Sequence, residues 1–166
     1  MNKKELTIEL IPSSTFYNNA RNNISEIIWN KIRIQCYKKA KYKCEICGET
    51  GIEQSYEHKL ECHEIWMFDD KEHIQRLIGL TCLCVLCHKV KHFGLSKLNG
   101  EEKIAIEHLM KVNNITKDQA NFIISRAFNQ WKKRSEHEWK LDISYLNQYL
   151  NNINKIKNDR NSKNKQ

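Results

Sequence analysis

Regular spacing of hydrophobic residues predicts several helices in this chain. In one segment, apolar side chains recur every three or four residues, which places them on one face of a helix. These residues are Ile24, Ile27, Ile28, Ile32, Cys36 and Ala40. Asn23, followed by Glu26 three residues later, is typical of a helix start. Similar spacing and start signals predict further helices from Asn99, from Thr116 and from about Asp142.

Two segments alternate apolar and polar residues, which is typical of strands. Residues 6–10 predict a strand that ends at Pro12. Residues 60–66, with the sequence LECHEIW, alternate in the same way but place His63 and Glu64 side by side. Ionisable residues are rarely buried unless they are paired or bind a metal. This second strand is therefore expected to contribute to a site as well as to the core.

The cysteines predict a metal site. Two Cys-x-x-Cys pairs are present, Cys44 with Cys47 and Cys84 with Cys87. Each pair can offer two thiolates to one tetrahedral ion, so a structural Zn²⁺ is expected, with a redox dithiol or an iron–sulfur cluster as alternatives. The remaining cysteines, Cys36, Cys62 and Cys82, lie in apolar segments and are predicted to be buried free thiols.

Two histidines beside the second cysteine pair indicate a second cation site. His88 follows Cys87 directly, and His92 comes four residues later. On a helix, this spacing puts both imidazoles on one face. With His63 available as a third ligand, the pair predicts a second metal centre, the alternative being two solvent-exposed histidines.

At these residues the chain resembles the HNH nucleases, the ββα-metal family, in their zinc-stapled form. The resemblance rests on the segments CEICG, LECHEI, GLTCLC and CVLCHKVKH and covers about Cys44 to His92. It implies an α+β fold: a ββα-metal hairpin–helix module with a four-cysteine zinc, flanked by α-helices. It also implies hydrolysis of DNA phosphodiester bonds with one catalytic divalent cation, Mn²⁺, Zn²⁺, Ni²⁺ or Mg²⁺.

The resemblance also implies roles for individual residues. The expected ligands of the catalytic cation are His63, His88 and His92. Glu64 falls where the family usually has its general-base histidine, and Lys89 and Lys91 are near enough to meet phosphates. Gly79 falls where the family's asparagine is expected, which departs from the pattern. Three imidazoles suit zinc, manganese, nickel or cobalt better than magnesium.

Other assignments of the His63–Glu64 pair stay open. In a shifted register, Cys62 is the ligand and His63 is the base. Alternatively, Glu64 only orients a histidine, and the base comes from outside the motif. The residues near enough in sequence for that role are His58, Asp69, Asp70 and His73.

Charge and composition bear on the partner and the compartment. The net charge of +8 and pI of about 9.1 favour an anionic partner, DNA first, with RNA also possible. Residues 151–166 contain five Lys or Arg and one acid, so they form either a phosphate-contacting arm or a solvated tail. No apolar run is long enough to span a membrane, and no secretory signal is expected. Cysteines predicted to bind metal suit a reducing cytoplasm.

The chain of 166 residues is expected to form one domain over residues 1–150, followed by the basic tail. Its motif core spans residues 44–94, with helical flanks at 23–43 and 99–150. The predicted function is a metal-dependent DNA endonuclease. The alternative is a non-catalytic zinc-binding module that binds nucleic acid or a protein partner.

Overall fold

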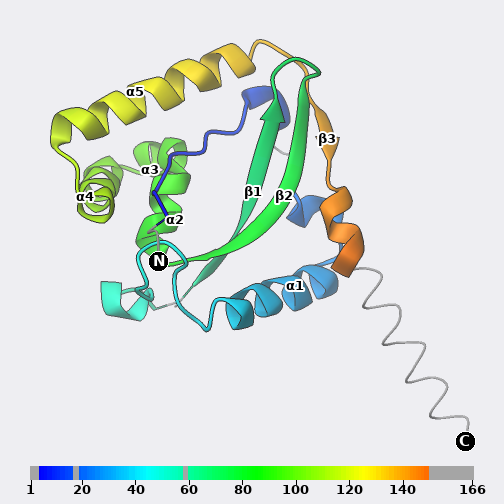
Figure 1. The fold of residues 1–166 in the computed structure, drawn as a ribbon, viewed down its shortest axis with the longest axis horizontal. Helices are drawn as coiled ribbons and strands as arrows, with labels where there is room; N and C mark the ends of the chain where they lie inside the picture. The colour runs from blue at the N-terminus through cyan, green and yellow to red at the C-terminus, as the bar shows by residue number, and fades with distance from the viewer. Residues whose placement is uncertain (1–3, 17–18, 58–59, 150–166) are drawn as a thin grey trace, which may run out of the picture.

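The fold is α+β, with a small three-stranded sheet among helices (Figure 1). The computed structural model describes residues 4–16, 19–57 and 60–149. Strands β1 (Glu61–Asp69) and β2 (Ile74–Leu83) form an antiparallel hairpin, and β3 (Lys140–Asp142) pairs with β2 in parallel. The strand order is β1-β2-β3, so one edge of β1 is not paired with another strand of this sheet.

Five helices surround the hairpin in the described part of the chain. They are α1 (Glu26–Lys39), α2 (Val85–Lys91), α3 (Phe93–Leu98), α4 (Glu102–Asn113) and α5 (Lys117–Arg134). Short 3₁₀ helices are also present at Ser13–Thr15, Arg21–Asn23, Ile52–Gln54 and Ser144–Leu146. In Figure 1, α2, α3 and α4 lie to the left of the hairpin, α5 runs above these three helices toward the hairpin's tip, and α1 lies below.

The buried apolar residues form two clusters. One includes the first part of the chain, the end of β2 and helices α2, α3, α4 and α5: Leu6, Leu83, Val90, Phe93, Leu109, Val112 and Ala120. The other packs α1 against the hairpin: Trp29, Ile32, Cys36, Cys62, Leu77 and Cys82. The prediction that Cys36, Cys62 and Cys82 are buried free thiols is therefore confirmed.

Of three predicted helix caps, one is confirmed and two are wrong. At α5, the Thr116 side chain accepts a hydrogen bond from the Gln119 backbone, and the Gln119 side chain accepts one from the Thr116 backbone, as a capping box requires. At α1, the N-cap is Ser25, which accepts from Ile28, and Asn23 lies in a preceding 3₁₀ turn. The predicted Asn23 cap is therefore wrong. Helix α4 begins at Glu102, but Asn99 is not its cap.

The predicted strand at residues 6–10 is wrong. The described structure has no strand there, and the segment runs past α2 toward the 3₁₀ helix at Ser13–Thr15 (Figure 1). The Leu6 backbone bonds to the side chain of Asn113 on α4, and the Glu9 amide donates to the carbonyl of Lys91 at 3.0 Å. The alternating apolar residues of this segment, Leu6 and Ile8, pack on the helices instead.

The C-terminal helix begins later than predicted. It was expected from about Asp142, but this residue ends β3. A 3₁₀ turn follows at Ser144–Leu146, and residues 147–149 are α-helical. The rest of the expected helix, from residue 150, and the basic tail at 151–166 lie outside the described residues. No helix in the described ranges is long and apolar enough to cross a membrane.

Candidate metal centres

The four cysteines of the two Cys-x-x-Cys pairs converge on one point. Cys44 and Cys47 lie in the loop after α1, Cys84 is the N-cap of α2, and Cys87 lies in the first turn of that helix. Their sulfur atoms all lie within 4.8 Å of one another, and the Sγ atoms of Cys47 and Cys84 are 3.4 Å apart. The cluster is placed to bind a metal ion such as zinc.

Hydrogen bonds to sulfur support this cluster. The Gln54 amide donates to Cys84 Sγ at 3.1 Å, and His108 Nε2 lies 3.2 Å from Cys87 Sγ. Hydrogen bonds among the four thiols lower the pKa of Cys44 to about 6 and raise the pKa of Cys47 and Cys87, because the sulfur atoms lie so close together. Gln54 and His108 were missed in the sequence because they lie outside both Cys-x-x-Cys pairs.

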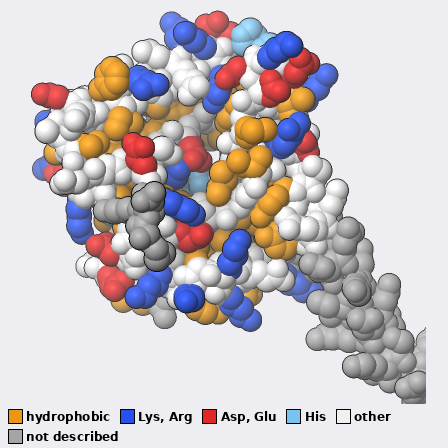
Figure 2. Space-filling model, viewed as in Figure 1, with side chains coloured by type: hydrophobic (Ala, Val, Ile, Leu, Met, Phe, Trp, Pro, Cys, Tyr) orange, Lys and Arg blue, Asp and Glu red, His pale blue; other side chains and the backbone are white. Residues whose placement is uncertain are grey.

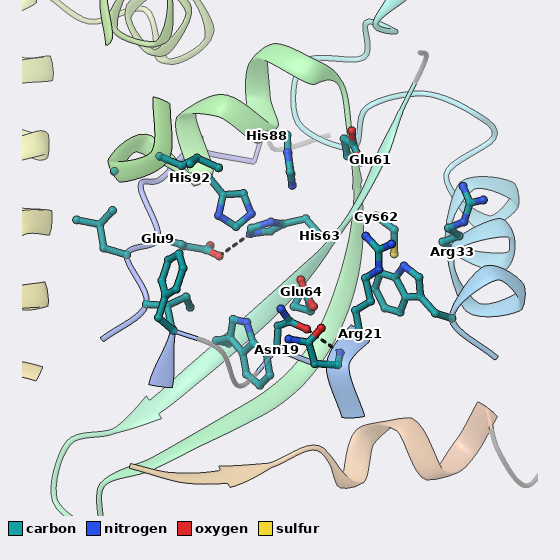
Figure 3. A pocket seen from close by; sticks show the side chains of 18 of the residues that line it. Glu9, Asn19, Arg21, Arg33, Glu61, Cys62, His63, Glu64, His88 and His92 are labelled. Carbon is teal, nitrogen blue, oxygen red and sulfur yellow. Dashed lines mark hydrogen bonds and ion pairs between the residues drawn. The ribbon is translucent and has the colours of Figure 1, made fainter. Parts of the chain in front are cut away.

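The three histidines predicted to bind a cation also converge. His63 comes from β1, His88 from α2, and His92 is the residue that ends α2 and precedes α3. One ligand nitrogen from each lies within 4.8 Å of the other two. The ring centroids are 4.5–5.4 Å apart, and Figure 3 shows the three rings gathered together.

The histidine cluster fits a divalent cation on two grounds. His63 is only 3% exposed, and among the described residues its Nδ1 has no hydrogen-bond partner, which is unusual for a buried polar atom. Burial, together with the neighbouring His63, lowers the pKa of His92 to about 4, so this imidazole is neutral and can donate a lone pair at pH 7. Neutral imidazoles are suitable ligands for zinc-like ions.

Glu9 is a neighbour of this cluster that sequence reasoning missed. One carboxylate oxygen lies 3.0 Å from His63 Nε2, and the other accepts a hydrogen bond from the Lys91 ammonium group. Burial alone would raise the pKa of Glu9, but the hydrogen bond from His63 and the charge of Lys91 together lower it. Glu9 is therefore a carboxylate at neutral pH.

The two lysines expected to meet phosphates are placed differently from the expectation. Lys91 is 6% exposed, and its ammonium group is bonded to Glu9 and Thr7 inside the protein. Lys89 is partly buried and pairs with Glu101. Neither ammonium group is available on an open surface, because each is already engaged by a carboxylate.

A cleft of about 1130 Å³ opens beside the histidines. Figure 2 shows a hollow on this face, with a histidine side chain inside it and hydrophobic side chains along one wall. Both His63 and Glu64 line the cleft, although neighbouring strand residues point to opposite faces. They can do so because β1 is the outer strand and the cleft extends around its edge.

The geometry separates the alternatives for the His63–Glu64 pair. The histidine cluster contains His63 and not Cys62, which packs in the core between α1 and the hairpin. His63 and not Cys62 is therefore placed with His88 and His92, and Glu64 lies next to it at the cleft, which Glu9 and Glu61 also line.

Three of the residues considered as bases outside the motif, Asp69, Asp70 and His73, lie at the β1–β2 turn of the hairpin. Asp69 accepts two backbone hydrogen bonds in the turn between β1 and β2, and Asp70 is paired with Arg134. His73 stacks on His137 at 4.3 Å. None of the three lines the cleft, and His58 lies outside the described residues.

Replacing Cys47 with serine should remove the metal from the cysteine cluster and lower the melting temperature sharply. In small zinc peptides, metal binding contributes about 10–16 kcal/mol to folding, so loss of one thiolate affects the whole fold. The measurement is zinc content per chain together with a thermal melt followed by circular dichroism. Cys36→Ser is the control, because it changes a buried thiol outside the cluster. Full zinc content in Cys47→Ser would contradict a four-cysteine zinc site.

Comparisons with known proteins leave the interpretation to the residues themselves. No protein-family model, no curated protein and no solved structure matches this chain. The clusters at Cys44, Cys47, Cys84 and Cys87 and at His63, His88 and His92 are therefore the observations from which a function can be inferred.

Proposed function

We propose that this protein is a metal-dependent DNA endonuclease of the HNH, or ββα-metal, type. The observation that carries the proposal is the convergence of His63, His88 and His92 within 4.8 Å, at a cleft and next to a four-cysteine cluster. A purely structural zinc module requires the four cysteines as ligands, but it does not require three buried or half-buried imidazoles. The arrangement of β1, β2 and α2 around the histidines supports the same interpretation.

In phosphodiester hydrolysis, the three histidines and Glu64 have different roles. His63, His88 and His92 would bind the divalent cation, which supplies positive charge close to the phosphate oxygens. Glu64 takes a proton from the attacking water as the water oxygen bonds to phosphorus. The bond between phosphorus and the leaving oxygen breaks in the same displacement, and that oxygen then takes up a proton from solvent. Glu64 is suited to this part because it lines the cleft beside His63.

Arg21 and Arg33 are the cations best placed to bind the substrate backbone. Both line the cleft (Figure 3). The Arg33 Nε donates to Asn30 Oδ1 at 2.7 Å, which orients the guanidinium group. Guanidinium groups bind phosphates through charge-assisted hydrogen bonds. These two residues therefore take the place expected for Lys89 and Lys91.

Replacing Glu64 with glutamine should preserve the fold and both metal sites but reduce cleavage by roughly 10²–10⁴-fold, the usual contribution of a general base. The measurement is plasmid cleavage with Mn²⁺, Mg²⁺, Zn²⁺ or Ni²⁺ added. Glu61→Gln is the matched control, because Glu61 lies on the same strand and lines the same cleft. Near wild-type cleavage by Glu64→Gln would rule out Glu64 as the base.

The variant His63→Ala distinguishes the remaining assignments in the same assay. If His63 is a ligand, the second metal and the cleavage activity are lost together. If His63 is the base, cleavage stops while the second metal stays bound. Absence of cleavage by the wild type with every ion, combined with retained DNA binding, would favour a non-catalytic zinc module.

Replacing Arg33 with glutamine should weaken DNA binding by roughly 10–150-fold, because a hydrogen bond to a charged group is worth about 1.5–3 kcal/mol. It should also reduce the slope of log Kd against log salt concentration by about one. Binding is measured by fluorescence anisotropy in a Glu64→Gln background, so that the DNA stays intact. Lys31→Gln is the matched control, because it removes one charge from an exposed position of the same helix. Equal effects of the two variants would assign the loss to net charge alone.

A further inference from the structure

The position of Glu9 requires an explanation that the nuclease-like motif does not provide. Glu9 lies in the first described segment of the chain, far in sequence from residues 44–92, yet its carboxylate reaches His63. In Figure 3, Glu9 lies beside His63 and is joined to it by a hydrogen bond. The contact therefore depends on how the N-terminal segment packs against α2.

We propose that Glu9 is a positioning residue for the histidine cluster: it accepts the Nε2 hydrogen of His63 and so presents the Nδ1 lone pair of His63 to the divalent cation. The proposal rests on the proposed function, since it assigns a role toward the cation of that site. A carboxylate can only accept a hydrogen bond, so the hydrogen of the neutral His63 ring lies on Nε2. Nδ1 is then unprotonated, and it is buried without a hydrogen-bond partner among the described residues.

Lys91 holds the Glu9 carboxylate in place. Its ammonium group donates to the second carboxylate oxygen of Glu9 and, at 2.7 Å, to the hydroxyl of Thr7. Its carbonyl accepts from the Glu9 backbone amide at 3.0 Å, so the two residues are joined at both side chain and backbone. A lysine that is only 6% exposed needs such partners, because an unpaired buried ammonium group is strongly unfavourable.

The geometry favours an indirect role for Glu9 over direct binding of the cation. The group of ligand atoms that lie within 4.8 Å of one another comprises the three histidines and not Glu9. In many metal sites, a carboxylate accepts the free N–H of a ligating histidine, fixes its ring and tautomer, and increases its basicity. Glu9, His63 and the cation would form an arrangement of this kind.

The N-terminal segment is therefore part of the site. The Leu6 backbone is fixed to α4 by two hydrogen bonds with the Asn113 side chain, at 2.8 and 2.9 Å. Leu6 itself is completely buried. These contacts anchor the segment three residues before Glu9, so the carboxylate is positioned by the folded core and is independent of substrate.

The test is the affinity of the histidine site for Mn²⁺, measured by calorimetry on the full chain with its cysteine zinc retained. Glu9→Gln should weaken Mn²⁺ binding by about 10–100-fold, as loss of such a partner typically does. Glu5→Gln is the matched control, because it removes a carboxylate from the same segment at an exposed position and should leave the affinity unchanged. Glu9→Asp keeps the charge but shortens the side chain, so it should also weaken Mn²⁺ binding. It replaces Glu9→Gln in this test if Glu9→Gln does not fold.

A second readout follows the His63 ring without any added Mn²⁺. Nitrogen-15 NMR of the imidazoles should show the proton of His63 on Nε2 in the wild type, with this preference reduced in Glu9→Gln. Wild-type Mn²⁺ affinity in both Glu9 variants would overturn the role of Glu9 and leave the proposed function intact. Absence of Mn²⁺ binding by the wild type would overturn both proposals.

Discussion

Helix α2 carries residues of both clusters of potential metal ligands, although seven residues are too few to form a stable helix in water. Cys84 caps its N-terminus and Cys87 lies in its first turn, so a metal bound to the cysteines would stabilise the first turn of the helix. His88 lies in the middle and His92 at the end. The orientation of both imidazoles therefore depends on how firmly the cysteine cluster and the surrounding core hold this one short element.

The cysteine cluster is also connected to the strand that provides His63. The Glu45 carboxylate, located between Cys44 and Cys47, accepts hydrogen bonds from the Thr81 hydroxyl and the Cys82 amide on β2. In the β1–β2 register, His63 is opposite Thr81. The loop that contributes two sulfur ligands is thus bonded to the part of β2 that pairs with His63. Binding of a structural metal would fix the distance between β1 and α2, and with it the spacing of the three histidines.

Local patterns, and the two ligand sets built from them, could be predicted from the sequence, but contacts with residues outside these patterns could not. The Cys-x-x-Cys pairs, the His88–His92 spacing and the Thr116 capping box depend on residues within a few positions of one another. Glu9 was missed because its contact with His63 spans 54 positions and no local pattern indicates it. Other failures have related causes. The alternation in residues 6–10 comes from packing on helices, and β3 has only three residues and pairs with a distant strand.

The number of metal ions per chain tests the central claim most directly. Native mass spectrometry of the full chain, purified with zinc and then titrated with Mn²⁺, counts these ions. Two ions are expected for the wild type, one in each cluster, and one for His92→Ala, which keeps all four cysteines. A wild type that never binds more than one ion, or a His92→Ala variant that still binds two, would contradict a second metal centre formed by the histidines.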